Sequence, residues 1–155
     1  MNVISDFIGK FNARINLDQN LVVEKNDRYF LLNKNLKRLI TKDFFYAGTY
    51  LGKTKDGTFF PSFNLLVMIA QTDAKKITVD NKTEWLFICG RDVFKEGIKS
   101  MTKPAGKDDY TLILNECGDC LGFGRILHSA GEKEDKNKVA VKNIADIGDF
   151  LRRER

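Results

Sequence analysis

The sequence contains few of the residues that mark secreted, fibrous or membrane-spanning proteins. Its 155 residues include 3 cysteines, 2 prolines and 12 glycines, which excludes collagen-like and disulfide-dense classes. The longest apolar run, residues 65–70, is far shorter than the roughly 20 residues that a membrane span needs. The N-terminus carries Asp6 and Lys10 and has no uninterrupted apolar region, so we expect no signal peptide. We therefore expect a soluble cytoplasmic protein with reduced thiols.

Charge is distributed unevenly along this otherwise globular composition. Hydrophobic residues make up 43% and charged residues 30%, and the net charge is +5. Residues 1–78 hold 12 Lys and Arg against 7 Asp and Glu, whereas residues 79–155 hold 14 of each. A basic surplus indicates an anionic partner, most commonly nucleic acid. In the second half such a partner would need a local cluster, such as Arg152, Arg153 and Arg155.

Residues 74–80 form a polar, lysine-bearing segment and the chain after them is richer in glycine, which predicts a boundary between two halves, 1–76 and 77–155. Apolar periodicity and turn residues predict the elements of each half. In the first half we expect a helix at 3–15, a hairpin of strands 21–23 and 29–32, a short helix at 36–40, a hairpin of strands 47–52 and 58–63, and a strand running into a helix at 64–74. In the second half we expect a strand at 83–89, a helix at 91–99, a hairpin of strands 110–116 and 121–127, a charged loop at 131–138, a strand at 139–141, and a terminal turn or helix at 144–153.

No motif in the chain establishes an enzyme. Gly52-Lys53-Thr54 is similar to the end of a phosphate-binding loop, but that loop needs a glycine at position 47, where the chain has Ala47. His128 is the only histidine, and the adjacent pair Asp108-Asp109 predicts a solvated loop rather than paired catalytic carboxylates. We therefore expect no catalytic residues and no small-molecule substrate.

The cysteines do not establish a metal site either. Cys117 and Cys120 have metal-ligand spacing, but a structural zinc ion needs four ligands, and only Cys89 and His128 remain to complete them. We expect ordinary strand residues beside a hairpin turn, with no metal and no cofactor. Phe123, between two glycines, could be a stacking platform for bases, but a core position beside closely packed backbone is favoured.

Three blocks of the second half, in this order and spacing, resemble a PUA domain, the compact pseudo-barrel of pseudouridine synthases and archaeosine transglycosylases. Residues 89–98 resemble the family's first helix, which ends in a Gly-Ile pair, residues 110–127 resemble its central hairpin, and residues 139–153 resemble its closing strand and final turn. The resemblance implies an α+β fold. An N-terminal α/β pre-PUA domain, 1–76, would precede a PUA-type β pseudo-barrel with short helices, 77–155.

Two further stretches resemble the Nip-seven family of large-subunit ribosome-biogenesis factors. Residues 145–152 are similar to that family's C-terminus, and residues 48–53 resemble the Gly-Thr-x-x-Gly-Lys strand of its pre-PUA domain. Eukaryotic members usually continue with an acidic tail, so the end at Arg155 suggests the shorter archaeal type or a shortened chain. The resemblance implies a non-enzymatic, RNA-binding factor in pre-rRNA processing. It would work with pre-rRNA and with other ribosome-biogenesis or RNA-processing proteins, in the cytoplasm or, in a eukaryote, the nucleolus, and not at a membrane.

The resemblance also implies where RNA would lie, since PUA domains bind it beside the first helix and the C-terminal strand and turn. Carried over by position, this nominates Arg91, Lys95 and Lys99 on the predicted helix, Lys142 on the closing strand, and Arg152, Arg153 and Arg155 at the end. Arginine suits phosphate because its planar guanidinium donates two parallel hydrogen bonds. Asp146 and Asp149 interrupt this basic face.

Two other functions remain as alternatives to RNA binding. In the first, the protein is an adaptor whose front domain docks and recruits or regulates an RNA-processing or RNA-modifying enzyme. In the second, it is itself an RNA-modifying enzyme, which is disfavoured because no catalytic-aspartate domain or cofactor loop accompanies the PUA-like half.

Overall fold

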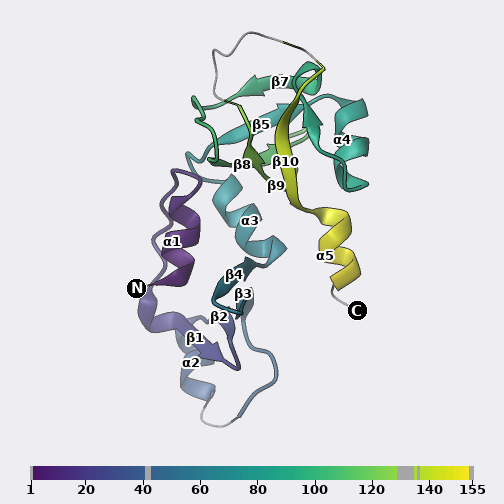
Figure 1. Ribbon diagram of the computed structural model, residues 1–155. Coiled ribbons are helices and arrows are strands. Elements are labelled where there is room, and N and C mark those ends of the chain that lie inside the picture. Colours follow the sequence, from purple (N-terminus) through teal and green to yellow (C-terminus); the bar gives the residue numbers. More distant parts are fainter. Residues whose placement is uncertain (1, 41–42, 129–134, 136, 154–155) are drawn as a thin grey trace.

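The chain forms two β-sheets with helices between and beside them, and the predicted α+β class is confirmed (Figure 1). The computed structural model describes residues 2–40, 43–128, 135 and 137–153. The first sheet has four strands in the order β1-β2-β3-β4, and the second has six in the order β6-β10-β9-β8-β5-β7. No helix in the described residues is long and apolar enough to span a membrane.

The N-terminal half contains the four-stranded sheet, and both of its predicted hairpins are confirmed. Its elements are α1 (Val3–Gly9), η1 (Gln19–Leu21), β1 (Val22–Lys25), β2 (Arg28–Leu31), α2 (Lys34–Leu39), β3 (Thr49–Lys55), β4 (Thr58–Pro61) and α3 (Phe63–Ala70). Asn26 and Asp27 take left-handed φ values of 50° and 60°, as the tight turn between β1 and β2 requires. The Ser62 hydroxyl accepts a hydrogen bond from the Leu65 N–H at 3.1 Å, so the stretch after it begins as a helix and not as a strand.

The C-terminal half wraps its six strands into a nearly closed barrel (Figure 1). Its elements are β5 (Lys76–Val79), α4 (Asn81–Ile88), β6 (Val93–Phe94), η2 (Lys95–Gly97), β7 (Ile98–Met101), β8 (Tyr110–Leu114), β9 (Cys120–Ile126), β10 (Val139–Asp146) and α5 (Ile147–Arg153). Strand β5 runs parallel to β8, and the other pairs are antiparallel. The predicted β8–β9 hairpin, the closing strand and the terminal helix are confirmed. Most of the predicted loop at 131–138 lies outside the described residues.

Two predicted elements at the start of this half are wrong. Residues 83–89, predicted as a strand, lie mostly in α4, and residues 91–99, predicted as a helix, form β6, η2 and the start of β7. Asp80 caps α4, because its carboxylate accepts a hydrogen bond from the Thr83 N–H at 2.8 Å. Gly90, with a φ of 89°, ends α4 instead of preceding a new helix. The block that resembles the PUA family's first helix therefore follows the helix of this chain.

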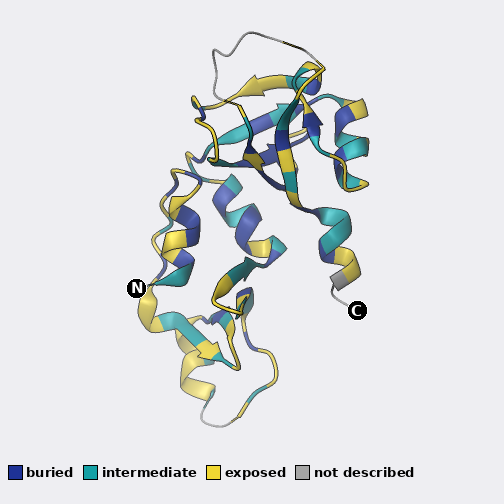
Figure 2. Cartoon of the chain, viewed as in Figure 1, coloured by how far each residue is buried: buried dark blue, intermediate teal, exposed yellow. Residues whose placement is uncertain are grey.

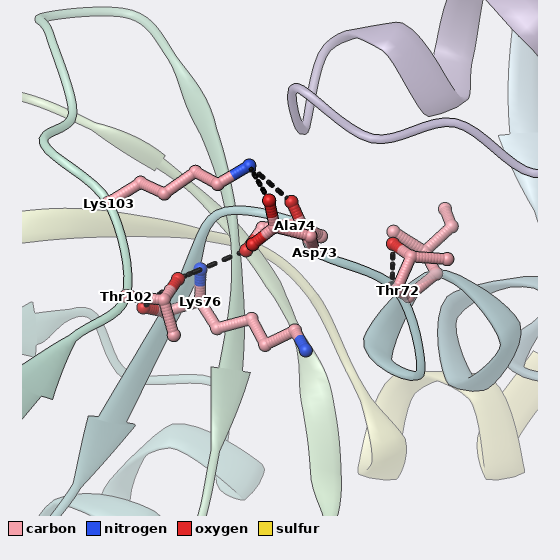
Figure 3. A network of polar contacts seen from close by, with 7 residues as sticks. Thr72, Asp73, Ala74, Lys76, Thr102 and Lys103 are labelled. Carbon is pink, nitrogen blue, oxygen red and sulfur yellow. Dashed lines mark hydrogen bonds and ion pairs between the residues drawn. The ribbon is translucent and has the colours of Figure 1, made fainter.

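Side chains hold the connection between α3 and β5 in place, where the two halves meet (Figure 3). The Thr102 hydroxyl donates to the Ala74 carbonyl oxygen at 3.0 Å and accepts from the Lys76 N–H at 3.0 Å. Lys103 Nζ forms an ion pair with Asp73 Oδ2 at 2.8 Å. The connection is therefore anchored to the segment after β7. The predicted domain boundary falls at this connection and remains a prediction.

One hydrophobic core spans both halves of the chain. The rings of Phe7 and Phe11 each pack edge-on against Phe123 of β9, with 5.7 Å between centroids, and Tyr110 packs on it at 5.5 Å. Phe123 is only 3% exposed, so its predicted core position is confirmed and the base-stacking alternative is wrong. Aromatic pairs of this kind add to the energy of burial, and they attach α1 to the barrel.

Candidate nucleic-acid interface

A Schellman motif ends α4 and determines where Arg91 lies. The Gly90 N–H donates to the Phe87 carbonyl oxygen at 2.9 Å, and the Arg91 N–H donates to the Leu86 carbonyl oxygen at 3.0 Å. The left-handed conformation of Gly90 turns the chain away from the helix. Arg91 is therefore an exposed residue at the C-terminal end of α4.

Asn143 on β10 ties this helix end to the neighbouring strand. Its side-chain amide donates to the Phe87 carbonyl oxygen at 3.0 Å and to the Arg91 carbonyl oxygen at 3.3 Å. Its backbone N–H donates to Asp92 Oδ1 at 2.9 Å, and Asp92 Oδ2 forms an ion pair with Lys142 Nζ at 3.0 Å. This network brings the Lys142 ammonium to the segment that carries Arg91.

Helix α5 packs on the same end of α4 through a glycine. Gly148 approaches so closely that a Cβ atom built on it would lie 2.6 Å from the Ile88 carbonyl oxygen. Asp146 Oδ1 accepts a hydrogen bond from the Asp149 N–H at 2.9 Å and so caps the start of α5. Arg152 Nη1 lies 3.2 Å from the same Cβ position. The guanidinium of Arg152 is thereby placed where α5 meets α4.

The predicted RNA-binding residues fall into two groups. Arg91, Lys142 and Arg152 gather where α4, β10 and α5 meet, a region we call the α4–α5 junction. Lys95 lies in η2 and Lys99 on β7, so the prediction that both share one helix with Arg91 is wrong. In Figure 1, β7 and α5 lie at opposite ends of the C-terminal half. Two predicted groups lie outside the described residues: the side chain of Arg153 and the whole of Arg155.

Strand pairing places Lys99 near the N-terminal end of α4, because Val79, just before Asp80, lies opposite Ile98 in the β5–β7 pair. The Thr83 N–H holds the pKa of Asp80 below its ordinary value of 3.8, and the positive charge of Lys99 lowers this pKa further. Lys99 therefore lies near the N-terminal cap of α4, whereas Arg91 follows its C-terminal end. The 8 residues of α4 separate these ends by about 12 Å.

Acidic side chains surround the Lys95–Lys99 side of α4. An open depression of about 500 Å³ lies beside the helix, and most of its ionisable lining residues are acidic: Asp80, Asp92 and Glu96, against Lys82. Lys99 Nζ is also paired with Glu116 Oε1 at 3.5 Å. Asp92 belongs to the junction as well, where it pairs with Lys142. Asp80, Glu96 and Glu116 belong to this side alone and would repel phosphate groups, so this side is the less suitable one for RNA.

The two arginines of the α4–α5 junction are available to an anionic ligand. Arg91 and Arg152 are exposed, and neither guanidinium forms an ion pair within the part of the chain that the structure describes. Lys142 keeps its own carboxylate partner in Asp92. The junction thus offers two free planar groups of the kind that bind phosphate bidentately.

The two cysteines of the Cys117–Cys120 pair lie in different surroundings. Burial raises the pKa of the Cys120 thiol to about 11, so this thiol stays protonated at neutral pH. Cys89 and Cys117 are exposed. Among the described residues, no three His, Cys, Asp or Glu side chains form a group that could hold a metal ion.

Three residues that build the junction were not among the sequence candidates: Asn143, Asp92 and Gly148. The capping role of Asp146 has a local signal, because an Asp directly before a helix is a common N-cap. Asn143 has no such signal, since one of its acceptors lies 56 positions away in the sequence.

Comparison with known proteins identifies the C-terminal half. The family description "UPF0113 PUA domain" matches residues 75–155. A UPF0113 protein from Archaeoglobus fulgidus is 28% identical over 119 residues, which cover 71% of this chain and 63% of the relative. This chain therefore spans less than two thirds of that relative's length. The 60S ribosome subunit biogenesis protein NIP7 homolog of Danio rerio is 28% identical over 136 residues, which cover 83% of this chain and 76% of the relative.

A solved structure shows the same fold over nearly the whole chain. A conserved PUA domain protein from Thermoplasma acidophilum aligns with a TM-score of 0.63 and 22% identity, covering 97% of this chain and 91% of that one. The resemblance to PUA domains and to the Nip-seven family, drawn from the sequence blocks, is confirmed. The chain belongs to the UPF0113 PUA-domain family, and the proteins similar to it include archaeal UPF0113 proteins and eukaryotic NIP7 homologues.

Proposed function

We propose that this protein is a non-enzymatic RNA-binding factor of large ribosomal subunit biogenesis that acts in pre-rRNA processing. Its relatives in fish, frogs and mouse are named 60S ribosome subunit biogenesis proteins, and this supports the same cellular role here. That role places the protein in the cytoplasm, or in the nucleolus if the source is a eukaryote. Its partners would be pre-rRNA and other ribosome-biogenesis proteins.

The α4–α5 junction is the RNA surface that the geometry of the C-terminal half supports best. The observation that carries this proposal is the pair of exposed guanidinium groups of Arg91 and Arg152 at one helix end, neither of which forms an ion pair with a described residue. Each can donate two parallel hydrogen bonds to one phosphate. Lys142 adds a third cation to the junction, while Lys95 and Lys99 would extend the surface only past the acidic side of α4.

The test is a double substitution, Arg91→Ala with Arg152→Ala, measured by fluorescence anisotropy with labelled RNA over a series of salt concentrations. The slope of log affinity against log salt is negative, and each phosphate contact to a single strand contributes about −0.7 to it. Loss of two contacts should therefore make the slope less steep by about 1.4. Affinity should fall evenly across RNA sequences, because phosphate contacts carry no base identity. Exposed substitutions of this kind should change stability by less than about 0.5 kcal/mol.

The matched control is Arg14→Ala with Lys82→Ala, which removes two exposed cations that lie outside the junction. The control should leave the salt slope near that of the unsubstituted protein. Equal losses in the two double variants would mean that RNA responds to net charge alone, and the junction would not be the binding surface.

A second candidate function is docking of a protein partner. Trp85 on α4 and Leu151 on α5 are each 65% exposed, and aromatic residues such as tryptophan are enriched at protein interfaces. Binding of RNA that is undetectable even at low salt would favour this adaptor function over the RNA-binding one.

A further inference from the structure

The four-stranded sheet and α2 concentrate both the positive charge and the aromatic residues of the chain. Residues 22–61 contain 8 Lys and Arg against 4 Asp and Glu, and thus hold +4 of the net charge of +5. They also contain 8 of the 17 aromatic residues. Most of α2 is exposed (Figure 2). In Figure 1, β1, β2 and α2 lie at the opposite end of the molecule from α4, so this surface is separate from the α4–α5 junction.

Strand register places a row of cations across one face of this sheet. Lys25 lies opposite Arg28 in the β1–β2 pair, Arg28 lies opposite Lys53 in the β2–β3 pair, and Lys53 lies opposite Phe60 in the β3–β4 pair. Residues directly opposite one another in antiparallel strands share a face of the sheet. Lys55, two positions after Lys53, lies on the same face. We call this face, with the segment 43–47 that covers part of it, the outer face.

Aromatic side chains lie beside this row on the outer face. Phe30 of β2 lies opposite Tyr50 of β3. It is only 1% exposed, because three other rings cover it. Phe44, Tyr46 and Tyr50 pack on it with 5.6, 5.3 and 5.5 Å between ring centroids. These four rings therefore pack into one aromatic cluster on the outer face.

Phe45 is the exception, because its ring projects into solvent. It is 84% exposed, and Tyr46 beside it is 57% exposed. The Arg28 guanidinium lies 5.8 Å from the centroid of the Phe45 ring, within the distance of a cation–π contact. The folded protein thus holds an exposed planar ring next to a guanidinium, an arrangement on which a base could stack while its phosphate meets the arginine.

The charges near the row leave part of it open to an anion. Lys25 forms an ion pair with Asp43, and Asp27 and Asp56 lie in the two hairpin turns. Lys53 and Lys55 are exposed, and neither forms an ion pair with any residue that the structure describes. Two lysines and Arg28 therefore remain for an anionic ligand on this face.

We propose that the outer face of the four-stranded sheet is a second nucleic-acid site that binds single-stranded RNA, with Phe45 stacking on a base and Arg28, Lys53 and Lys55 contacting the backbone. Single-stranded sites combine stacking aromatics with a cationic path for the backbone, and both occur here on one face. A duplex would not fit, because its bases are already stacked and cannot meet the ring. The proposal does not depend on RNA binding at the α4–α5 junction.

The direct test is a fluorescence reporter at position 45. The protein has a single tryptophan, so the double variant Trp85→Phe with Phe45→Trp carries its one indole on the outer face. A single-stranded RNA of about 10 nucleotides should quench this indole in a saturable way, because a base stacks on it. The same strand in a duplex, and a polyglutamate peptide of equal charge, should leave the fluorescence nearly unchanged.

Two outcomes of this titration would overturn the proposal. In the first, single-stranded RNA binds by anisotropy but leaves the indole unquenched, which would place the RNA elsewhere. In the second, polyglutamate quenches the indole as strongly as RNA does, which would make the outer face a docking surface for an acidic protein segment.

Binding measurements on the otherwise unsubstituted protein separate stacking from charge. Phe45→Ala should weaken binding of single-stranded RNA by at least about fivefold and leave the salt slope unchanged. Lys53→Ala with Lys55→Ala should make the negative salt slope less steep by about 1.4. The control Arg14→Ala with Lys82→Ala should do neither. Phe45 is so exposed that its replacement should change the melting temperature by less than about 2 °C.

The two proposed sites fail in different ways. If Arg91→Ala with Arg152→Ala leaves RNA affinity unchanged while the position-45 indole is still quenched, the junction proposal is wrong and the outer face stands. If the junction variant loses affinity while Phe45→Ala binds normally, the outer face is not an RNA site.

Discussion

Replacing Gly148 with alanine should destabilise the protein, although the same change in an ordinary helix stabilises. Alanine is favoured over glycine within a helix by about 0.5–1 kcal/mol. Here the new Cβ would lie 2.6 Å from the Ile88 carbonyl oxygen, about 0.8 Å closer than the 3.4 Å at which ordinary van der Waals contact begins. The obstacle is backbone of α4 and cannot rotate away, so α5 must shift. Overpacking of this kind costs about 1–3 kcal/mol, and the net result should be a loss of about 1–2 kcal/mol.

The measurement is thermal and urea unfolding, followed by the fluorescence of Trp85 on α4 and by circular dichroism. A loss of about 1–2 kcal/mol should lower the melting temperature by about 2–8 °C in a chain of this size. RNA affinity should fall as well, because displacement of α5 carries Arg152 away from Arg91. The control is Gly9→Ala, at the end of α1, where nothing lies within 4 Å of the new Cβ. It should stabilise the protein by up to about 1 kcal/mol and leave RNA affinity unchanged. If Gly148→Ala stabilises as much as the control, α5 does not pack on α4 as described, and the reasoning fails.

Two further predictions concern groups with shifted pKa values. Asp80→Ala should remove the N-cap of α4 and cost about 1 kcal/mol at pH 7, measured by urea unfolding. Because hydrogen bonding from the Thr83 N–H lowers the pKa of Asp80 below 3.8, the carboxylate's contribution is complete above about pH 4 and is lost as pH falls through the native pKa. The difference between Asp80→Ala and the unsubstituted protein should therefore shrink as the pH falls below 3.8. Asp80→Asn, a comparable cap without charge, should show no such pH dependence. A difference that stays constant at low pH would contradict the capping role of the carboxylate. Among the cysteines, Cys89 and Cys117 should react quickly with a thiol reagent in the native protein, because both are exposed. Cys120, buried and with its pKa raised to about 11, should react only after unfolding, and a third fast thiol in the native protein would show that the β8–β9 hairpin opens.

The hairpins could be predicted from the sequence because their signals are local. Asn26-Asp27 and Asp56-Gly57 adopt left-handed backbone conformations that these residue types tolerate, and the flanking apolar strands follow directly. The error over residues 81–99 has a local cause as well. Asp80 and Gly90 are ordinary start and stop signals of a helix, but the apolar residues between them also fit a strand pattern. The local sequence therefore does not show that Gly90 ends a helix instead of preceding one.

The candidate sites were predictable only in part. The family resemblance indicates Arg91, Lys142 and Arg152 as candidates, and the structure brings these three residues together at one end of α4. Lys99 was nominated by the same resemblance and lies at the other end of α4, because the segment after Gly90 is extended and runs back along the helix. The cation row on the outer face depends on strand register, and a shift by one residue would move every side chain to the opposite face.

The α+β class, the turns, the excess of charge in the first half and the family can all be predicted from the amino-acid sequence. These follow from backbone preferences of single residues, from apolar spacing within one element, and from blocks of residues in a fixed order. Three contacts are visible only in the tertiary structure. Asn143 joins β10 to α4, and Gly148 lets α5 pack against Ile88. Lys53 lies opposite Arg28 in strand register, beside an exposed Phe45. Each of these depends on atoms that are distant in the chain and meet only after the strands have paired and the core has closed, so no local pattern encodes them.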